Sequence, residues 1–63
     1  MSLTEKEEEV MQLVCEGFTN TEIAEKLIVS THTIKAHIES IFYKLHARNR
    51  AGAVFLYCKQ NPF

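Results

Sequence analysis

Residues 19–46 read TNTEIAEKLIVSTHTIKAHIESIFYKLH and contain two helix starts separated by a short apolar break. Thr19 followed three residues later by Glu22 is a capping box, in which each side chain bonds the other residue's backbone amide at a helix N-terminus. Residues 28–29 (Ile-Val) interrupt the helical spacing, and Ser30 is a favourable N-cap for the next helix. A short helix, a tight turn and a longer helix form a helix-turn-helix unit.

The longer helix of this unit, expected at about residues 31–46, has one apolar and one polar face. At helical spacing, one narrow stripe contains Ile34, Ile38, Ile41 and Leu45. We expect this stripe to face the core. The opposite face carries His32, Ala36, Glu39 and Tyr43, with Lys35 and His46 at its edge. Such a face lies in the major groove when a helix-turn-helix binds DNA, although helical pairs also occur in plain bundles.

Two further helices are predicted on either side of this unit. Thr4 with Glu7 is another capping box, and Gly17 is suited to end that helix in the left-handed conformation. Asn49 is a possible cap for a fourth helix at about residues 50–60, before Pro62. The sequence therefore predicts an all-α, four-helix domain with its recognition helix at about residues 31–46.

The length of the chain limits the number of domains and the size of the core that it can form. A chain of 63 residues is expected to form one domain over residues 1–63, with a modest core and no room for a deep catalytic cavity. No nucleophile–base pair or glycine-rich phosphate loop is present. We therefore expect no enzyme activity and no cofactor.

Neither the histidines nor the cysteines are spaced for a metal site. His32, His37 and His46 cannot share one helix face, so no metal ion is expected. Cys15 and Cys58 lie in no metal-binding motif, and we expect both to be reduced and buried like small hydrophobic residues rather than joined in a disulfide.

Charge is distributed unevenly along the chain. Residues 1–30 hold two Lys and seven Glu, net −5, whereas residues 31–63 hold five Lys or Arg and one Glu, net +4. This asymmetry is typical of a surface that meets a polyanion, although a solvated helix face also carries such residues. No apolar run approaches the roughly 18 residues of a membrane span, and the acidic, polar start differs from a signal peptide. We expect a cytoplasmic chain with no membrane contact.

A wider pattern of residues runs through these elements. It comprises Leu3-Thr4, Glu7, Gly17, Asn20, Glu22-Ile23-Ala24, Leu27, Ser30, Thr33-Ile34-Lys35, His37, Lys44-Leu45 and Asn49-Arg50. The pattern resembles the LuxR-type helix-turn-helix family, the output domain of many bacterial response regulators and quorum-sensing regulators. The resemblance extends from Leu3 to about Val54 without gaps. It implies a dimer on inverted DNA half-sites, with the third helix in the major groove and the fourth in the dimer contact, often with a receiver or ligand-binding domain upstream.

The resemblance and the helix faces together predict the DNA interface. Base contacts are expected from His32, Lys35, Ala36 and Glu39, and phosphate contacts from Asn20, Thr33, His37 and Lys44. Lys35 can donate to guanine, and Ala36 can touch a thymine methyl group. Glu39 can accept from cytosine N4; alternatively, it pairs with Lys35 or points to solvent.

Three positions depart from the pattern of the family. Thr21 stands where the family usually has Lys or Arg, and Glu39 replaces a common Ser, Asn or Lys. His46-Ala47 replaces a common glycine–hydrophobic pair, so the turn there must form without its usual glycine.

The fourth helix has a second apolar side in addition to the one that faces the core. The core side is expected to contain Ala53, Leu56 and Tyr57. The predicted dimer contact consists of Ala51, Val54, Phe55 and Cys58. The alternative is that Phe55 folds back over Pro62 or Phe63.

These features predict a sequence-specific regulator of transcription that binds double-stranded DNA, or the C-terminal output domain of one. The alternative is a helix-turn-helix fold used as a protein-interaction module without DNA binding. The net charge of −1, Thr21 and Glu39 support that alternative.

Overall fold

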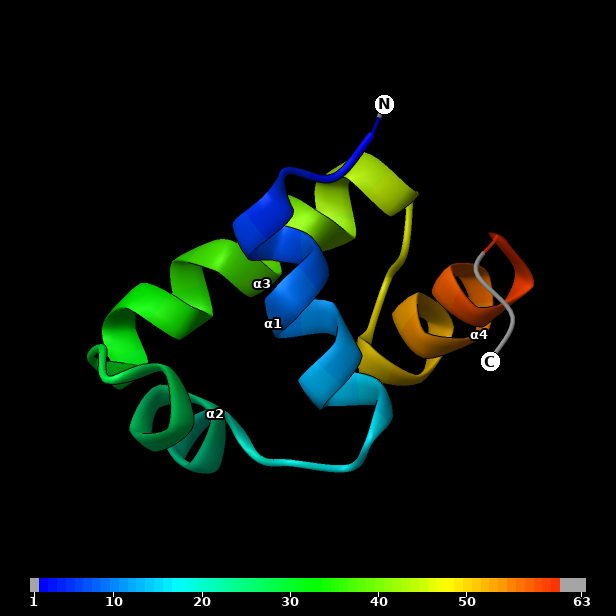
Figure 1. Cartoon of the computed structure of the whole chain (residues 1–63). Helices are drawn as coiled ribbons and strands as arrows, with labels where there is room; N and C mark the ends of the chain where they lie inside the picture. Colours follow the sequence, from blue (N-terminus) through cyan, green and yellow to red (C-terminus); the bar gives the residue numbers. More distant parts are fainter. Residues whose placement is uncertain (1, 61–63) are drawn as a thin grey trace.

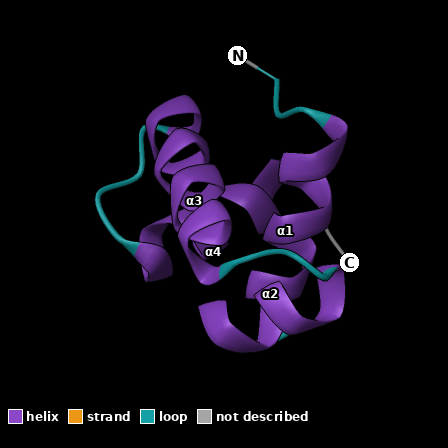
Figure 2. Cartoon of the chain, turned by 90° about the vertical axis from the view of Figure 1, so that its left-hand side faces the viewer, coloured by secondary structure: helices purple, strands orange, loops and turns teal. Residues whose placement is uncertain are grey.

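Four helices make up residues 2–60, the part of the chain that the computed structural model describes (Figure 1). They are α1 (Glu5–Cys15), α2 (Asn20–Leu27), α3 (Thr31–Leu45) and α4 (Arg50–Gln60). Short loops join them, and no strand occurs within residues 2–60 (Figure 2). The predicted all-α, four-helix fold is therefore confirmed. None of these four helices is both long and apolar enough to cross a lipid bilayer.

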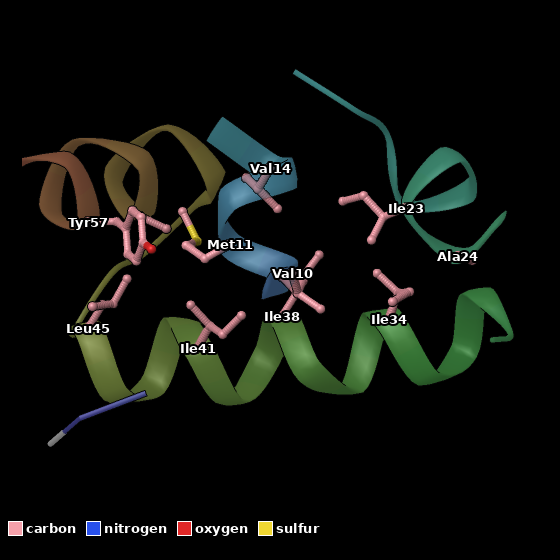
Figure 3. Packing of buried hydrophobic residues seen from close by; sticks show 11 residues of the cluster. Val10, Met11, Val14, Ile23, Ala24, Ile34, Ile38, Ile41, Leu45 and Tyr57 are labelled. Atoms are coloured by element: carbon pink, nitrogen blue, oxygen red, sulfur yellow. The ribbon is translucent and has the colours of Figure 1, made fainter. Parts of the chain in front are cut away.

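The core is built on the apolar stripe of α3, which contacts all three other helices. The predicted stripe is confirmed as buried, and its residues point from α3 toward α1, α2 and α4 (Figure 3). Facing it are Val10, Met11 and Val14 of α1, Ile23 and Ala24 of α2, and Ala53 and Tyr57 of α4. Because one face of α3 is fully used in this packing, its opposite face is left on the surface.

The helix starts follow the predicted local signals. Both capping boxes form: the Glu7 amide donates to Thr4 Oγ1 at 3.1 Å, and the Glu22 amide donates to Thr19 Oγ1 at 3.2 Å. Ser30 caps α3 by accepting from the Thr33 amide at 3.1 Å. These bonds satisfy amides that have no partner within the helix, so the sequence fixes where α1, α2 and α3 begin.

Three helices end in the same way, through one residue in the left-handed conformation. These residues are Gly17 (φ 95°) after α1, Ile28 (φ 58°) after α2 and His46 (φ 59°) after α3. In each case the next residue's amide bonds a carbonyl five residues earlier, at 3.2, 3.0 and 2.9 Å respectively. The predicted role of Gly17 is confirmed. The third helix ends at Leu45, one residue before the predicted end, because His46 takes the left-handed conformation.

Ile28 is an unfavourable residue for its position, and its replacement is expected to stabilise the domain. A β-branched side chain in the left-handed region is strained, and Ile28 is 89% exposed, so it contributes little packing in return. We expect Ile28→Asn to raise the free energy of unfolding by about 1 kcal/mol and the Tm by about 4–8 °C.

The matched control for this change is Val29→Asn at the next position, which lacks a positive φ. Thermal unfolding of both variants checks the prediction. A Tm for Ile28→Asn at or below that of the unsubstituted domain would show that the turn is not strained.

Candidate nucleic-acid interface

The four predicted base-contacting residues all lie on the exposed face of α3. The structure leaves the side chains of His32, Lys35, Ala36 and Glu39 open to solvent. Within residues 2–60, the side chains of Lys35 and Glu39 make no hydrogen bond or ion pair. Of the two alternatives for Glu39, the structure therefore has the one that points to solvent. Small, polar and charged side chains thus share a helix face that makes no packing contact with the core.

The residues predicted to contact phosphates are less exposed than the base-contacting set. Thr33 and His37 are half-buried along the edge of α3, and Thr33 Oγ1 lies 3.0 Å from Ser30 Oγ. Asn20 is also half-buried, at the first position of α2. Its Oδ1 accepts from Arg50, while the amide nitrogen keeps two donors that a phosphate oxygen can accept.

Arg50 holds the start of α2 in place, a role that the sequence analysis missed. Its Nη1 donates to Asn20 Oδ1 at 2.8 Å, and its Nη2 donates to the Phe18 carbonyl at 2.6 Å. The guanidinium of α4 therefore bridges to the loop before α2 and fixes the orientation of Asn20. Asn20 and Arg50 both belong to the quoted family pattern, which was the available signal for their pairing.

Lys44 makes an internal contact that the sequence analysis also missed. Its Nζ lies 2.7 Å from Glu7 Oε1, and the side chains of Lys44 and Glu7 are 20% and 6% exposed. Ser40 donates to the other oxygen, Glu7 Oε2, at 2.8 Å. A contact between Lys44 and a DNA phosphate would therefore have to compete with a largely buried ion pair.

Glu7 consequently takes part in the capping box of α1 and also accepts hydrogen bonds from two residues of α3. Burial by itself would raise the pKa of this carboxyl group. The hydrogen bonds from Lys44, the Thr4 amide and Ser40, together with the Lys44 charge, outweigh burial and lower the pKa to about 2, from an ordinary value of 4.5. Glu7 is therefore ionised at neutral pH, and it pairs with the lysine that the family resemblance assigns to a phosphate contact.

The second apolar side of α4 is only partly exposed. Phe55 is 67% exposed and Ala51 is also open to solvent, whereas Val54 and Cys58 are half-buried. The Cys58 thiol lies 3.9 Å from that of Cys15 in α1, so Cys58 faces the domain as well as the solvent. Both cysteines are free thiols in the structure, and both are half-buried, whereas the sequence predicts buried residues. The alternative contact of Phe55 with Pro62 or Phe63 falls outside the described residues.

Comparison with known proteins connects this geometry to one family. The sequence model described as "Bacterial regulatory proteins, luxR family" matches residues 1–57. The chain is 37% identical over 60 residues to the nitrate/nitrite response regulator protein homolog of Haemophilus influenzae, covering 95% of this chain and 29% of that protein. It is 42% identical over 60 residues to the transcriptional regulatory protein LiaR of Bacillus subtilis, covering 95% and 28%.

A third relative is much larger. The HTH-type transcriptional regulator MalT of Vibrio cholerae is 44% identical over 52 residues, which cover 82% of this chain and 6% of that protein. The chain thus spans less than a third of the length of each of these relatives. All three are named as regulators rather than enzymes, and the family model covers most of the chain. The chain belongs to the luxR family of bacterial regulatory proteins.

Proposed function

We propose that this domain binds duplex DNA sequence-specifically by placing the exposed face of α3 in the major groove. His32, Lys35, Ala36 and Glu39 face the base edges in this proposal, and Asn20, Thr33 and His37 lie toward the flanking phosphates. The observation that carries it is the exposed, polar face of α3, which makes no packing contact with the core, on a scaffold that matches the luxR family over residues 1–57.

The charges of the domain indicate that one copy binds DNA weakly. Of the five cations in residues 31–63, Lys44 is engaged by Glu7, and Arg50 by Asn20 and Phe18. The remaining cations are Lys35, Arg48 and Lys59, all exposed. Phosphate neutralisation supplies most of the sequence-independent affinity, so a DNA-binding half with three available cations gains much from a second copy on the same DNA.

Pairing of two copies through α4 supplies this second copy in our proposal. Ala51, Val54, Phe55 and Cys58 form the contact, with the exposed Phe55 ring at its centre. A twofold contact of this kind places two α3 helices on inverted half-sites. The area of the patch is small, so we expect weak association without DNA. The chain would act in the cytoplasm, as the output domain of a longer regulator with a receiver or ligand-binding domain upstream.

Phe55→Glu is expected to abolish self-association and leave the monomer folded. The substitution puts two carboxylates at the twofold contact, whereas the side chain is mostly exposed in the monomer. Sedimentation equilibrium over a concentration series measures the association, and circular dichroism reports the fold. Tyr43→Glu, which replaces a 74% exposed aromatic residue on α3, is the control. If Phe55→Glu associates as the unsubstituted domain does, α4 is not the dimer contact.

Selection of bound duplexes from a random pool tests the proposed function as a whole. We expect an enriched inverted repeat, because twofold pairing through α4 fixes the spacing of two half-sites. Enrichment of single half-sites would support sequence-specific DNA binding but contradict the proposed dimer. Failure to enrich any sequence would reject sequence-specific binding.

A further inference from the structure

Two thiols from opposite ends of the chain meet beside the junction of α1 and α4. Cys15 is the last residue of α1 and Cys58 lies near the end of α4, 43 positions later. Their sulfur atoms are 3.9 Å apart, and both side chains are half-buried rather than sealed in the core. One residue before Cys58, the Tyr57 hydroxyl donates to Glu8 Oε2 at 2.8 Å, which joins α4 to the first half of α1.

We propose that Cys15 and Cys58 form an oxidation site that reacts with low-molecular-weight disulfides and closes to an intramolecular disulfide between α1 and α4. A disulfide requires the sulfur atoms to approach to about 2.05 Å, so they must move together by about 2 Å. Both cysteines lie at or near helix ends and neither is sealed in the core, so the shift involves two half-buried side chains. The inference concerns the thiol pair alone and does not depend on DNA binding.

The reaction proceeds in two exchange steps with oxidised glutathione as the disulfide. The Cys58 thiol gives its proton to solvent, and its sulfur attacks one glutathione sulfur, which forms a mixed disulfide and releases one glutathione thiolate. Cys15 then loses its proton and attacks the Cys58 sulfur, releasing the second glutathione thiolate. Two protein thiols are oxidised by two electrons, and one glutathione disulfide is reduced to two thiols.

The two cysteines have different roles in this sequence. Burial raises the pKa of Cys15 to about 11, with further contributions from Cys58 and Glu16, so Cys15 is a thiol at neutral pH. Free thiols of this kind react slowly with an external disulfide. We therefore assign the first attack to Cys58 and the closing attack, which is intramolecular, to Cys15.

Incubation of the chain with oxidised glutathione, followed by intact mass and thermal unfolding, tests the proposal. We expect a monomer that has lost two hydrogen atoms and carries no glutathione. Closing a long loop restricts the unfolded chain, so its Tm should rise by on the order of 10–20 °C, and dithiothreitol should reverse the shift. Cys15→Ser and Cys58→Ser each lack the thiol that closes the disulfide, so each should stop with one glutathione attached, and Cys58→Ser should react more slowly because burial keeps the Cys15 pKa raised.

Three results would overturn the proposal: an unsubstituted chain that stays unmodified, a stable glutathione adduct on the unsubstituted chain, or a disulfide-linked dimer through Cys58. Unfolding of each serine variant in dithiothreitol shows whether it is folded before oxidation. If a serine variant is unfolded, the corresponding alanine variant replaces it in the same experiment.

Discussion

Glu7→Ala is expected to lower the free energy of unfolding by about 3–5 kcal/mol, a large part of the stability of so small a domain. The substitution removes the acceptor of the Thr4 amide, the Ser40 hydroxyl and the Lys44 amine together. Lys44 then keeps its charge in a site where its side chain is only 20% exposed. A cation that loses its partner in such a site destabilises the folded state, because water has too little access to solvate the charge fully.

Urea unfolding of Glu7→Ala and of Glu9→Ala measures this effect against a matched control. Glu9 lies on the same helix but is exposed, and its ion pair with Lys6 spans 3.8 Å across the surface. Such a surface pair contributes little, so we expect Glu9→Ala to change stability by less than about 0.5 kcal/mol. Equal losses in the two variants would show that the Glu7–Lys44 pair does not hold α1 to α3.

The same pair is expected to make the domain sensitive to acid. Because the folded-state pKa of Glu7, about 2, lies below its ordinary value of 4.5, the contribution of Glu7 is fully present above pH 4.5. It is lost as the pH falls from about 4.5 toward 2, where the unfolded state binds the proton more readily. Glu7→Gln, which does not titrate, should flatten this part of the stability profile measured by urea unfolding.

Lys35→Ala is expected to weaken binding to the selected duplex about 5- to 150-fold, which corresponds to about 1–3 kcal/mol if its contact with guanine is bidentate. Lys35 is exposed on α3, and its ammonium group is engaged by no other described residue, so its removal leaves the fold intact. The loss should be accompanied by relaxed preference at one base pair.

Fluorescence anisotropy with duplexes changed one base pair at a time measures both effects of Lys35→Ala. Lys6→Ala is the control, since Lys6 is an exposed lysine on α1, away from the proposed interface. We expect the affinity of Lys6→Ala for the duplex to remain within about twofold of that of the unsubstituted domain, because salt screens the interaction of distant surface charges with DNA. Unchanged affinity and base preference in Lys35→Ala would contradict the proposed docking of α3.

The helix boundaries and the core could be predicted because their signals are local. Thr4 and Thr19 each bond a residue three positions away, so the capping boxes are visible in the sequence itself. The stripe of α3 is equally visible, since the helical period places its four apolar residues on one face. Exposure of the opposite face follows from the same period.

The interactions that hold the helices together could not be predicted in the same way. The sequence predicts Glu7 as part of a capping box, but its bonds to Ser40 and Lys44 join residues 33 and 37 positions apart. The helical periodicity of the sequence does not reveal a pairing between residues so far apart in the chain. The sequence predicts a break in the helical pattern at Ile28, but the left-handed conformation of Ile28 depends on the α2–α3 turn as folded. The proposed DNA contacts rest on the family resemblance and on the exposed face of α3.

The salt dependence of duplex binding tests the proposed DNA-binding role of the exposed α3 face most directly. The measurement is the affinity of the unsubstituted domain for the selected duplex between about 50 and 200 mM salt. We expect the logarithm of the association constant to fall linearly with the logarithm of salt concentration, with a slope of about −0.9 for each phosphate neutralised. No measurable affinity for any duplex at the lowest salt would contradict DNA binding and favour a protein-interaction module built on the same fold.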